Sequence, residues 1–579
     1  MNPRNNVLDL ATRRGFLWQS HEIYGGIAGF YDLGPLGTLM GYKIIDLWRK
    51  MFIRRHQEFV VEIKTPIITP AIVFKASGHE EHFTDYAVEC KSCGRVYRAD
   101  HLIEEMLKVK AEGLKAHELE RLIREYSIKC PACGGELSSV RAFNLLFVTY
   151  VGPYSENNKA YLRPEAAQGM FVNFKKVYEY MRRRMPLGIA QIGRVARNEI
   201  SPRQRLIRLR EFTIMEMEFF FDPRDPKVEI LYERCSHRKI RVLRAEDKMR
   251  GGGPIEVTPV EAYEEKIIMC PWLAYWMCVA QEFIEALGVP YKDTMFEEKA
   301  PHELAHYSKQ TFDQLVRTER WGWIEVSGHA YRYDYDLSRH TKFSGEDLYA
   351  LRRLKEPKLV RREQLRIDKK IIIEHFGRSA AEVFRTLHTI PQDKLIKIVK
   401  ESTGEFVKIK NFEIPKSALK IEVVEEKVDV EKFLPHVAEP SFGLERLIYV
   451  ALEHAYREDN ERVYLALPPY IAPIQVAVFP LVSREPLTSI AHSLYKDLAE
   501  EFDVIYDDSG TIGRRYARAD EIGVPLAVTI DYKTVEDHTV TIRDRDSKKQ
   551  VRVPMPKVAE VVRQVIRGAK LLELGFPEV

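Results

Sequence analysis

The sequence predicts two parts: an α+β domain built on an antiparallel sheet, residues 1–468, with insertions, and an α/β domain, residues 469–579. Residues 194–220, RVARNEISPRQRLIRLREFTIMEMEFF, have the pattern of two strands joined by a polar, proline-containing loop, which indicates antiparallel pairing. Past residue 468, short apolar strands such as IQVAVFP alternate with amphipathic helices such as SIAHSLYKDLAEEF. Such alternation is typical of a compact α/β domain.

Composition limits the class of protein. The net charge is +4 over 579 residues, so any contact with nucleic acid must come from local basic patches. No run of 18 or more apolar residues occurs, and the N-terminus lacks the apolar core of a secretory signal, so we expect no membrane span. Seven cysteines in so long a chain do not indicate a disulfide framework, and we expect a cytoplasmic protein.

The first domain begins with helix and strand patterns. LMGYKIIDLWRKMFIRRH (39–56) has helical apolar spacing with basic residues between, and VVEIKTPIITP (60–70) predicts a strand interrupted by proline. A strand, a turn and a helix are predicted for residues 141–176, strands resume at WIEVSGHAYRYDYDL, and HVAEPSFGLERLIYVALEHAY predicts a further strand, turn and helix. Three stretches are predicted as insertions: residues 90–140, 222–320 and 345–430.

Four cysteines form two CxxC pairs, each followed by glycine: Cys90 with Cys93, and Cys130 with Cys133. Such knuckles let two thiolates reach one ion, and two of them complete a tetrahedral zinc site. With four sulfur ligands the site would be structural. The alternative is four unrelated core cysteines.

One face of the second arm of the 194–220 hairpin carries charge. Because strand side chains alternate, that face presents Arg208, Arg210, Phe212, Ile214, Glu216 and Glu218. A solvated outer face is the simple alternative. Arginines and carboxylates are segregated along the arm, however, and an aromatic ring sits between them. This order favours a ligand with anionic, flat and cationic parts.

Arg197, Glu199, Arg208, Phe212 and Glu216 in this arrangement resemble motif 2 of class II aminoacyl-tRNA synthetases. SFGLER (441–446) resembles motif 3, and the basic helix before the proline-marked strand resembles motif 1. YRADH, RPEAAQG, QIGRVARNEISPRQ, EPSFG, GTIGRRYARADEIG and TVTIRDRD are together similar to glycyl-tRNA synthetases of the α2, archaeal and eukaryotic type. The resemblance implies a class II synthetase fold and a ligase that activates glycine with ATP and transfers it to the 3′ end of tRNA(Gly).

The resemblance also implies the site. ATP would be bound by Arg197, Asn198, Glu199, Arg208, Phe212, Glu325, Val326, Gly443 and Arg446, with Arg197 and Arg446 as catalytic residues. Glycine would be bound by Arg98, Glu165, Glu216, Glu439 and Ser441. Glu325 or Glu439 would hold Mg²⁺ at the phosphates. Arg197 would stabilise the charge that develops at the α-phosphate.

Residues 469–579 resemble the class IIa anticodon-binding domain, in which Arg514, Arg515 and Arg518 would contact tRNA. A basic helix face without RNA is the alternative. Motif 1 usually builds a subunit interface, so the resemblance implies a homodimer. Two other functions are disfavoured. A non-catalytic RNA-binding paralogue should have lost Arg197, Arg446 or the ammonium-binding glutamates, which are all present. A synthetase for threonine, proline or histidine is disfavoured by the resemblance of EPSFG and RPEAAQG to the glycyl type.

Overall fold

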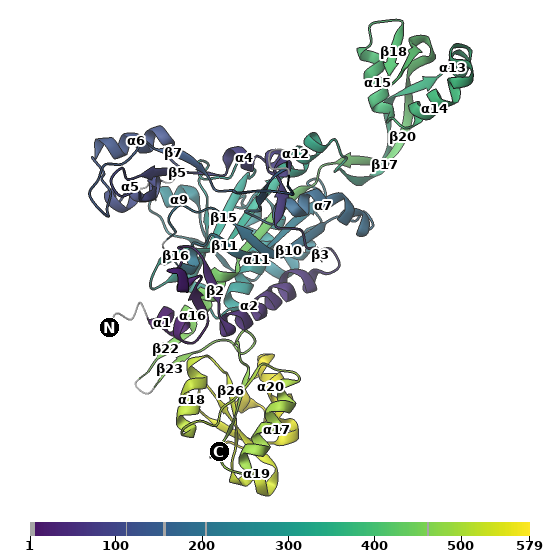
Figure 1. Cartoon of the computed structure of the whole chain (residues 1–579). Coiled ribbons are helices and arrows are strands. Elements are labelled where there is room, and N and C mark those ends of the chain that lie inside the picture. The colour runs from purple at the N-terminus through teal and green to yellow at the C-terminus, as the bar shows by residue number, and fades with distance from the viewer. Residues whose placement is uncertain (1–5, 110, 112, 154–157, 203–204, 460–461) are drawn as a thin grey trace. The chain divides into compact units, whose positions relative to one another are not determined.

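The structure is a computed structural model, in which residues 6–109, 111, 113–153, 158–202, 205–459 and 462–579 are described (Figure 1). It divides into two units, residues 1–348 with 434–579 and residues 349–433. Among the described residues, none of the helices combines the length and apolar composition that a bilayer crossing needs.

A nine-stranded sheet forms the centre of the first unit. Its strands in spatial order are β13 (Ile255–Val257), β12 (Ile240–Leu243), β14 (Thr294–Glu298), β15 (Gln310–Thr318), β16 (Gly322–Tyr333), β21 (His436–Gly443), β11 (Glu211–Phe221), β10 (Leu187–Ala196) and β3 (Val60–Glu62). The pairs β10/β3 and β12/β14 are parallel and the others antiparallel. The predicted hairpin is confirmed, because β10 pairs with β11 from Leu187↔Phe220 to Ala196↔Glu211.

One face of this sheet carries the main hydrophobic core. Met215, Met217 and Phe219 alternate along β11 and are fully buried. The ring of Phe219 lies 5.1 Å from that of Trp276, and Trp48 stacks on Phe52 at 5.1 Å. Burial of each such side chain contributes roughly 1.5–3 kcal/mol. The helices that supply this layer are α2 (Pro35–Trp48), α11 (Pro271–Ala286) and α16 (Leu444–Ala455).

Residues 222–320 differ from the predicted insertion. They supply β12, β13, β14 and β15 to the central sheet, together with α11 in the core layer. The charged stretches and the GGG at 251–253 belong to short connections, with α8 (Glu229–Cys235), α9 (Ala245–Met249) and α10 (Pro259–Glu264). Short strands of three to five residues carry too little alternation to be recognised beside such connections.

Smaller elements surround the sheet. The N-terminal elements are α1 (Asn6–Arg13), β1 (Leu17–Gln19) and β2 (Tyr31–Leu33). One three-stranded sheet contains β4 (Ile68–Pro70), β9 (Lys159–Leu162) and β8 (Phe147–Tyr150), and the other contains β6 (Val96–Arg98), β5 (Thr84–Glu89) and β7 (Arg141–Asn144). The remaining helices are α3 (Ala71–Ser77), α4 (His79–His82), α5 (Ala99–Leu107), α6 (Ala116–Glu125), α7 (Ala167–Tyr180) and α12 (Tyr335–Ser344).

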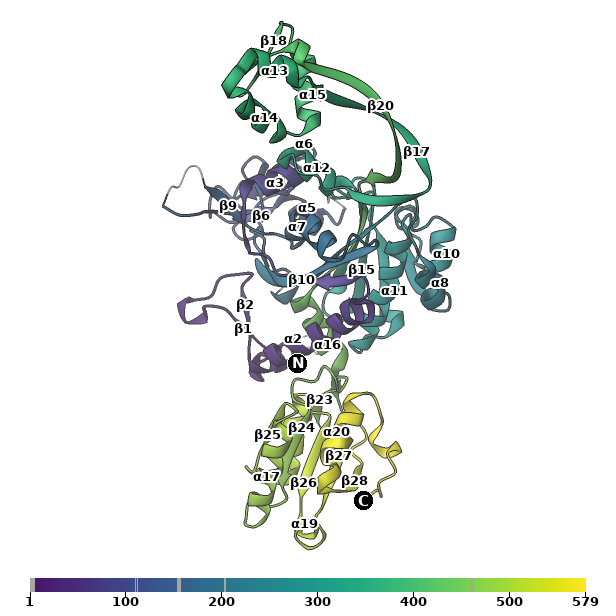
Figure 2. The ribbon, with the colours of Figure 1, turned by 90° about the vertical axis from the view of Figure 1, so that its right-hand side faces the viewer.

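Residues 349–433 form the second unit. Its two long strands, β17 (Ala350–Ile367) and β20 (Leu419–Phe433), pair antiparallel and run side by side in Figure 2. The remaining elements are α13 (Lys369–Phe376), α14 (Ala380–His388), α15 (Gln392–Glu401), β18 (Phe406–Ile409) and β19 (Phe412–Pro415). The basic stretch at 350–367, within the predicted insertion 345–430, forms the strand β17. It is paired with an acidic strand, so Arg361 bonds Glu425 across the ladder at 2.9 Å.

The C-terminal domain has a five-stranded sheet in the order β25 (Val504–Tyr506), β24 (Val476–Pro480), β26 (Leu526–Ile530), β27 (Thr539–Asp544) and β28 (Gln550–Pro554). A short hairpin, β22 (Tyr456–Glu458) and β23 (Val463–Leu465), precedes it. Val476 and Val478 face α17 (Leu487–Ala499) and α20 (Val558–Ile566), whereas Ala477 and Phe479 face α18 (Ile512–Glu521). The helix α19 (Tyr532–Asp537) connects β26 to β27. The predicted α/β domain is confirmed.

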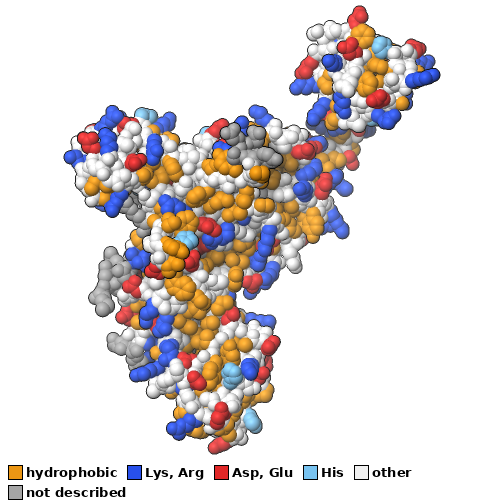
Figure 3. All heavy atoms as spheres, viewed as in Figure 1, with side chains coloured by type: hydrophobic (Ala, Val, Ile, Leu, Met, Phe, Trp, Pro, Cys, Tyr) orange, Lys and Arg blue, Asp and Glu red, His pale blue; other side chains and the backbone are white. Residues whose placement is uncertain are grey.

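On the face that Figure 3 shows, basic and acidic side chains are interspersed rather than gathered into one field. This agrees with the net charge of +4.

Candidate active site

A cavity of about 270 Å³ lies over the face of the central sheet opposite the aromatic core. Along β11, Phe212, Ile214 and Glu216 line it, as the alternation predicts. Twelve of the predicted residues meet there: Glu165, Arg197, Glu199, Arg208, Phe212, Glu216, Glu325, Val326, Glu439, Ser441, Gly443 and Arg446. Pairing of β11 with β21 and of β21 with β16 places Ser441 beside both Glu216 and Gly328.

Arginines line one part of the cavity. The Nε of Arg197 donates to the carbonyl of Pro164 at 3.0 Å, and its guanidinium lies 5.3 Å from the centre of the Phe212 ring. Arg446, in the first turn of α16, donates to the carbonyls of Ile207 and Glu325, both at 2.8 Å. These bonds to backbone carbonyls hold two cationic groups in place at the cavity.

Arg208 and Glu199 complete this part of the site. Arg208 lies 3.6 Å from a carboxylate oxygen of Glu199, and its NH1 lies 3.2 Å from Nδ1 of His101. Both Arg208 and Glu199 line the cavity, although Arg208 precedes β11 rather than lying within it. Residues 203–204 of the connecting loop lie outside the described residues.

Carboxylates line the other part, and all are buried. Glu165, Glu216 and Glu439 are 6%, 1% and 5% exposed. Glu216 accepts the backbone N–H of Ala166 at 2.7 Å, and Glu165 accepts from the amide of Gln168 at 2.9 Å. Three buried carboxylates around one space form a pocket for a small cation.

Arg332 holds these carboxylates together and was not predicted from the sequence. It is fully buried, donates to Glu439 at 3.1 Å and to Asp336 at 2.9 Å, and lies 3.4 Å from Glu165. Its guanidinium stacks on the ring of Tyr307 at 3.7 Å. The pair with Asp336 is local, four residues along the chain, but the pairs with Glu439 on β21 and with Glu165 before α7 are distant, so no local pattern indicates them.

His79 also contacts the carboxylates. It lies in the HEEH run, whose spacing does not fit a zinc protease, and its Nε2 is 3.3 Å from Glu165. Burial raises the pKa of Glu165, but the charges of His79 and Arg332 outweigh burial and hold that pKa well below its usual range. Burial raises the pKa of Glu216, and raises that of Glu439 well above its ordinary value. The pocket therefore combines one firmly ionised carboxylate with two that bind protons more tightly.

A second set of carboxylates, Glu325 and Asp313, lies in the part of the cavity near Arg446. Glu325 approaches Nη1 of Arg446 at 3.1 Å, and Asp313 approaches the ammonium of Lys299 at 2.7 Å. Burial and the charge of Glu325 raise the pKa of Asp313 to about 7. Glu439, the other predicted Mg²⁺ ligand, is instead bonded to Arg332 in the carboxylate pocket.

Two predicted residues do not line the cavity. Arg98 makes a bidentate pair with Asp100, at 2.8 and 2.7 Å, and a second pair with Asp85 at 3.2 Å, in a neighbouring hollow. Asn198 donates its backbone N–H to Leu145 and lines another hollow beside the cysteine pairs. In this structure two aspartates neutralise the charge of Arg98. The sequence pattern YRADH contains Asp100 but not Asp85.

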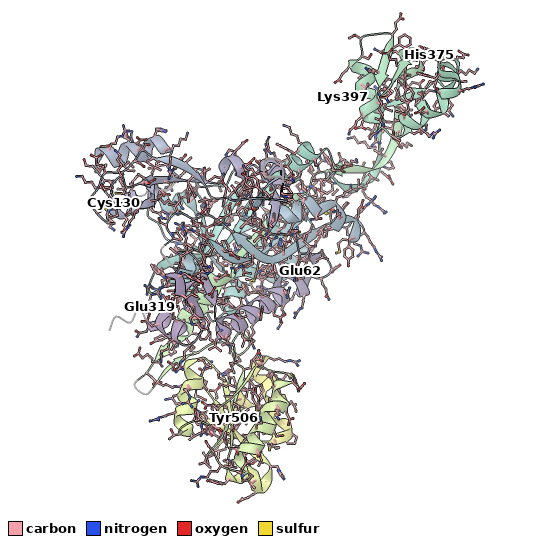
Figure 4. All side chains as sticks on the ribbon, in the orientation of Figure 1. Glu62, Cys130, Glu319, His375, Lys397 and Tyr506 are labelled. Carbon is pink, nitrogen blue, oxygen red and sulfur yellow. The ribbon has the colours of Figure 1, made fainter. Side chains whose placement is uncertain are left out.

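The four predicted cysteines converge. One sulfur from each of Cys90, Cys93, Cys130 and Cys133 lies within 4.8 Å of the others. Gly94 and Gly134 adopt left-handed φ values of 67° and 73°, and each donates its N–H back to the first cysteine of its pair. These are the tight knuckles that the glycines predict. They belong to the module of β5 to β7 with α5 and α6, where Figure 4 labels Cys130.

Comparison with known proteins identifies the same two parts of the chain, the domain with the central sheet and the C-terminal domain. A family model described as the tRNA synthetase class II core domain (G, H, P, S and T) matches residues 150–455, and one described as an anticodon binding domain matches residues 475–565. The chain is 54% identical to the glycine–tRNA ligase of Aeropyrum pernix, over 99% of this chain and 98% of that protein. It is 47% identical to that of Thermococcus sibiricus and 42% to that of Methanocaldococcus jannaschii, each over 97% of this chain and 98% of the relative.

The chain belongs to the glycine–tRNA ligase family. The class II fold and the ligase function predicted from the motifs are confirmed, and a threonine, proline or histidine enzyme is not supported. In this glycine–tRNA ligase family member the core-domain match spans β10, β11, β16 and β21, which carry the cavity. The same span contains residues 349–433, the separate unit.

The predicted tRNA-binding arginines of α18 differ in exposure. Arg514 is exposed, and Arg518 pairs with Asp507 at 2.5 Å while part of it remains accessible. Arg515 is only 1% exposed and donates to carbonyls of Pro480, Asp508 and Gly510. It therefore organises the loop before α18 instead of presenting its charge at the surface.

Proposed function

We propose that the cavity over the central sheet is where this glycine–tRNA ligase joins glycine to ATP and then passes glycine to tRNA(Gly). The observation that carries the assignment is that one cavity joins two fixed arginines to three buried carboxylates. ATP offers phosphates and an aromatic base, and glycine offers an ammonium and a carboxylate. The phosphates, the base and the ammonium each have a counterpart in the cavity, whereas Arg98, the predicted partner of the glycine carboxylate, lies in a neighbouring hollow.

In the first step a carboxylate oxygen of glycine bonds to the α-phosphorus of ATP and the bond to pyrophosphate breaks. No side chain has to act as nucleophile, so the rate depends on positioning and on charge stabilisation. Arg197, braced by Pro164, would meet the negative charge at the α-phosphate, and Phe212 would stack on adenine. Arg208 and Arg446 would meet the outer phosphates or the base, with Glu199, Val326 and Gly443 completing the nucleotide site.

The carboxylate pocket would take the ammonium of glycine. Glu165, Glu216 and Glu439 with Ser441 surround a space in which only a small cation is satisfied. Tyr307 lines the cavity, and its ring covers the guanidinium of Arg332. Arg98 would reach the glycine carboxylate only after releasing Asp85 or Asp100.

Mg²⁺ fits the acidic group near Arg446. Glu325 and Asp313 line the cavity and offer the carboxylate oxygens that Mg²⁺ prefers. Burial, and after it the charge of Glu325, raises the pKa of Asp313. Bound there with ATP, the ion would neutralise charge on the outer phosphates. Arg197 and Arg446 orient the nucleotide in either case.

The zinc, RNA and subunit assignments are proposed on separate observations. The four sulfurs suit one structural Zn²⁺. Arg514 and Arg518 offer charge on α18 for tRNA, whose transfer step uses a hydroxyl of the terminal ribose as nucleophile. A homodimer is supported by exposed apolar side chains near motif 1: Ile23, Tyr24 and Tyr42 are 88%, 86% and 65% exposed. Light scattering should then give the mass of two chains.

The deciding experiment is amino-acid-dependent exchange of labelled pyrophosphate into ATP, with each of the twenty amino acids and no tRNA. We expect exchange with glycine alone. Folded protein that supports no exchange in the presence of Mg²⁺ would contradict the assignment of the cavity. Charging of tRNA(Gly) then tests the second step.

A further inference from the structure

One buried carboxyl group next to the carboxylate pocket of Glu165, Glu216 and Glu439 has no role in the assignments above. Glu218 lies two residues beyond Glu216 on the same face of β11. It is fully buried, and neither of its carboxyl oxygens has a hydrogen-bond partner. An unpartnered buried carboxylate costs several kcal/mol as an order of magnitude, so such a group needs an explanation.

Glu218 belongs to a cluster. One carboxyl oxygen from each of Glu216, Glu218 and Glu439 lies within 4.8 Å of the others. The other two members have donors: Glu216 accepts from the Ala166 N–H at 2.7 Å, and Glu439 accepts from Arg332 at 3.1 Å. Glu218 is the member with none.

The charges around Glu218 are mostly of its own sign. Glu216 on β11, Glu439 on β21 and Asp336 on α12 face it with carboxyls, and Arg332 on β16 is the cation among these groups. Carboxylates this close in a buried site cannot all ionise, and the cluster keeps at least one proton. Burial raises the pKa of Glu218 well above its ordinary value, and the charge of Glu439 raises it further.

We propose that Glu218 is a positioning residue for the amino-acid substrate: as a neutral carboxylic acid behind Glu216 and Glu439, it offers them a hydrogen-bond donor. That hydrogen bond fixes the positions of the carboxylate oxygens of Glu216 and Glu439 in the carboxylate pocket. This inference rests on the proposed function of the cavity. Glu218 acts through the two carboxylates and does not touch the substrate.

The absence of charge on Glu218 matters as much as the hydrogen bond that it donates. A full negative charge on Glu218 would repel the carboxylates of Glu165, Glu216 and Glu439 and favour proton binding by them still further. A neutral acid leaves their charge available for the ammonium. Its effect is therefore confined to glycine, and the nucleotide part of the cavity does not depend on it.

Two substitutions separate the donor from the charge. Glu218→Gln keeps the shape of the neutral acid and an N–H donor, whereas Glu218→Leu removes the donor and fills the space. In glycine-dependent pyrophosphate exchange, we expect Glu218→Gln to keep a KM for glycine near that of the unchanged protein. Loss of a hydrogen bond to a charged group predicts that Glu218→Leu raises it about tenfold to a hundredfold. The KM for ATP should not change in either variant.

A matched control lies outside the pocket. Glu453 is half-buried, its pKa is raised by burial, and it accepts the N–H of Glu319. Glu453→Gln should leave the KM for glycine unchanged. Infrared difference spectra provide a second readout, because the carbonyl band of a buried neutral carboxylic acid should be present in the unchanged protein and absent from Glu218→Gln.

The outcomes are distinct. If Glu218→Gln raises the KM for glycine as much as Glu218→Leu does, Glu218 acts as a charge and the proposal is wrong. It is also wrong if the acid band persists in Glu218→Gln, which would place the proton on Glu439. A Glu218→Leu variant that loses ATP and glycine binding together would have lost its fold, and the Gln variant and the spectra then decide. Absence of glycine exchange in the unchanged protein would instead overturn the function of the cavity.

Discussion

Arg332 connects the chemistry of the pocket to the stability of the chain at the scale of single residues. Its guanidinium, fully buried, serves Glu165, Asp336 and Glu439 at once. A buried ion pair gains little over well-packed apolar groups, but removal of one partner leaves the others uncompensated. An arginine with three carboxylate partners is therefore difficult to replace.

The first prediction concerns this arginine. Arg332→Met should lower the free energy of unfolding by about 3–5 kcal/mol, because it strands buried carboxylates, and should raise the KM for glycine more than that for ATP. Urea unfolding and pyrophosphate exchange measure the two effects. The control is Arg361→Met, since Arg361 pairs with Glu425 with 77% of its side chain exposed, and it should change stability by less than about 1 kcal/mol. Equal effects of the two substitutions would argue against the network.

Asp313 gives the second prediction, which concerns pH. Its pKa in the folded chain is raised to about 7 from 3.8, so the folded state binds this proton more tightly than the unfolded state. Stability from this group is therefore present at low pH and is lost as the pH rises from about 4 to about 7.

Asp313→Asn, with Mg²⁺ removed by a chelator, should flatten that dependence and leave the variant more stable than the unchanged protein at pH 8. The upper bound is roughly 4 kcal/mol, a figure from the net pKa shift, which already includes the opposing effect of Lys299. Thermal unfolding from pH 5 to pH 8 provides the measurement. Parallel curves of stability against pH for the two proteins would show that the pKa of Asp313 is not raised in the folded state.

Elements differ in how far their sequence predicts them. Alternation along residues 211–221 predicts which side chains enter the cavity, and Phe212, Ile214 and Glu216 do so. Local chemistry also predicts the glycine knuckles. Arg332 could not be predicted, because its pairs with Glu165 and Glu439 span 167 and 107 residues of chain. Arg515 shows the converse: a basic helix face indicates surface exposure, but this arginine is buried against the loop before α18 and against Pro480 at the end of β24.

The third prediction is argued at the cysteine knuckles. Because their four sulfurs already converge, the protein should bind about one zinc ion per chain, and Cys93→Ser with Cys133→Ser should abolish it. The module of β5 to β7 should then unfold at lower temperature. Metal analysis and calorimetry measure both. Cys270→Ala, a buried cysteine outside the pairs, should keep its zinc. Retention of zinc by the double variant would place the metal elsewhere.

At the scale of the whole molecule, the cavity and the inserted unit are separable in sequence. The residues that line the cavity belong to the unit formed by 1–348 and 434–579, whereas 349–433 has an apolar core of its own around Ile372, Val383 and Val407. Ala350 pairs with Phe433, so the two ends of the insertion lie side by side, about 5 Å apart as in any antiparallel pair. A short linker can therefore join residue 349 to residue 434.

The fourth prediction follows from that geometry. Replacement of residues 350–433 by a glycine–serine linker should leave glycine-dependent pyrophosphate exchange close to that of the full chain, because no wall of the cavity is removed. Circular dichroism first establishes that the shortened chain is folded. Charging of tRNA(Gly) by the same variant then reports what the inserted unit contributes to RNA. A folded variant without exchange would mean that the activation step depends on residues 350–433, and the assignment of activation to the first unit alone would have to be withdrawn.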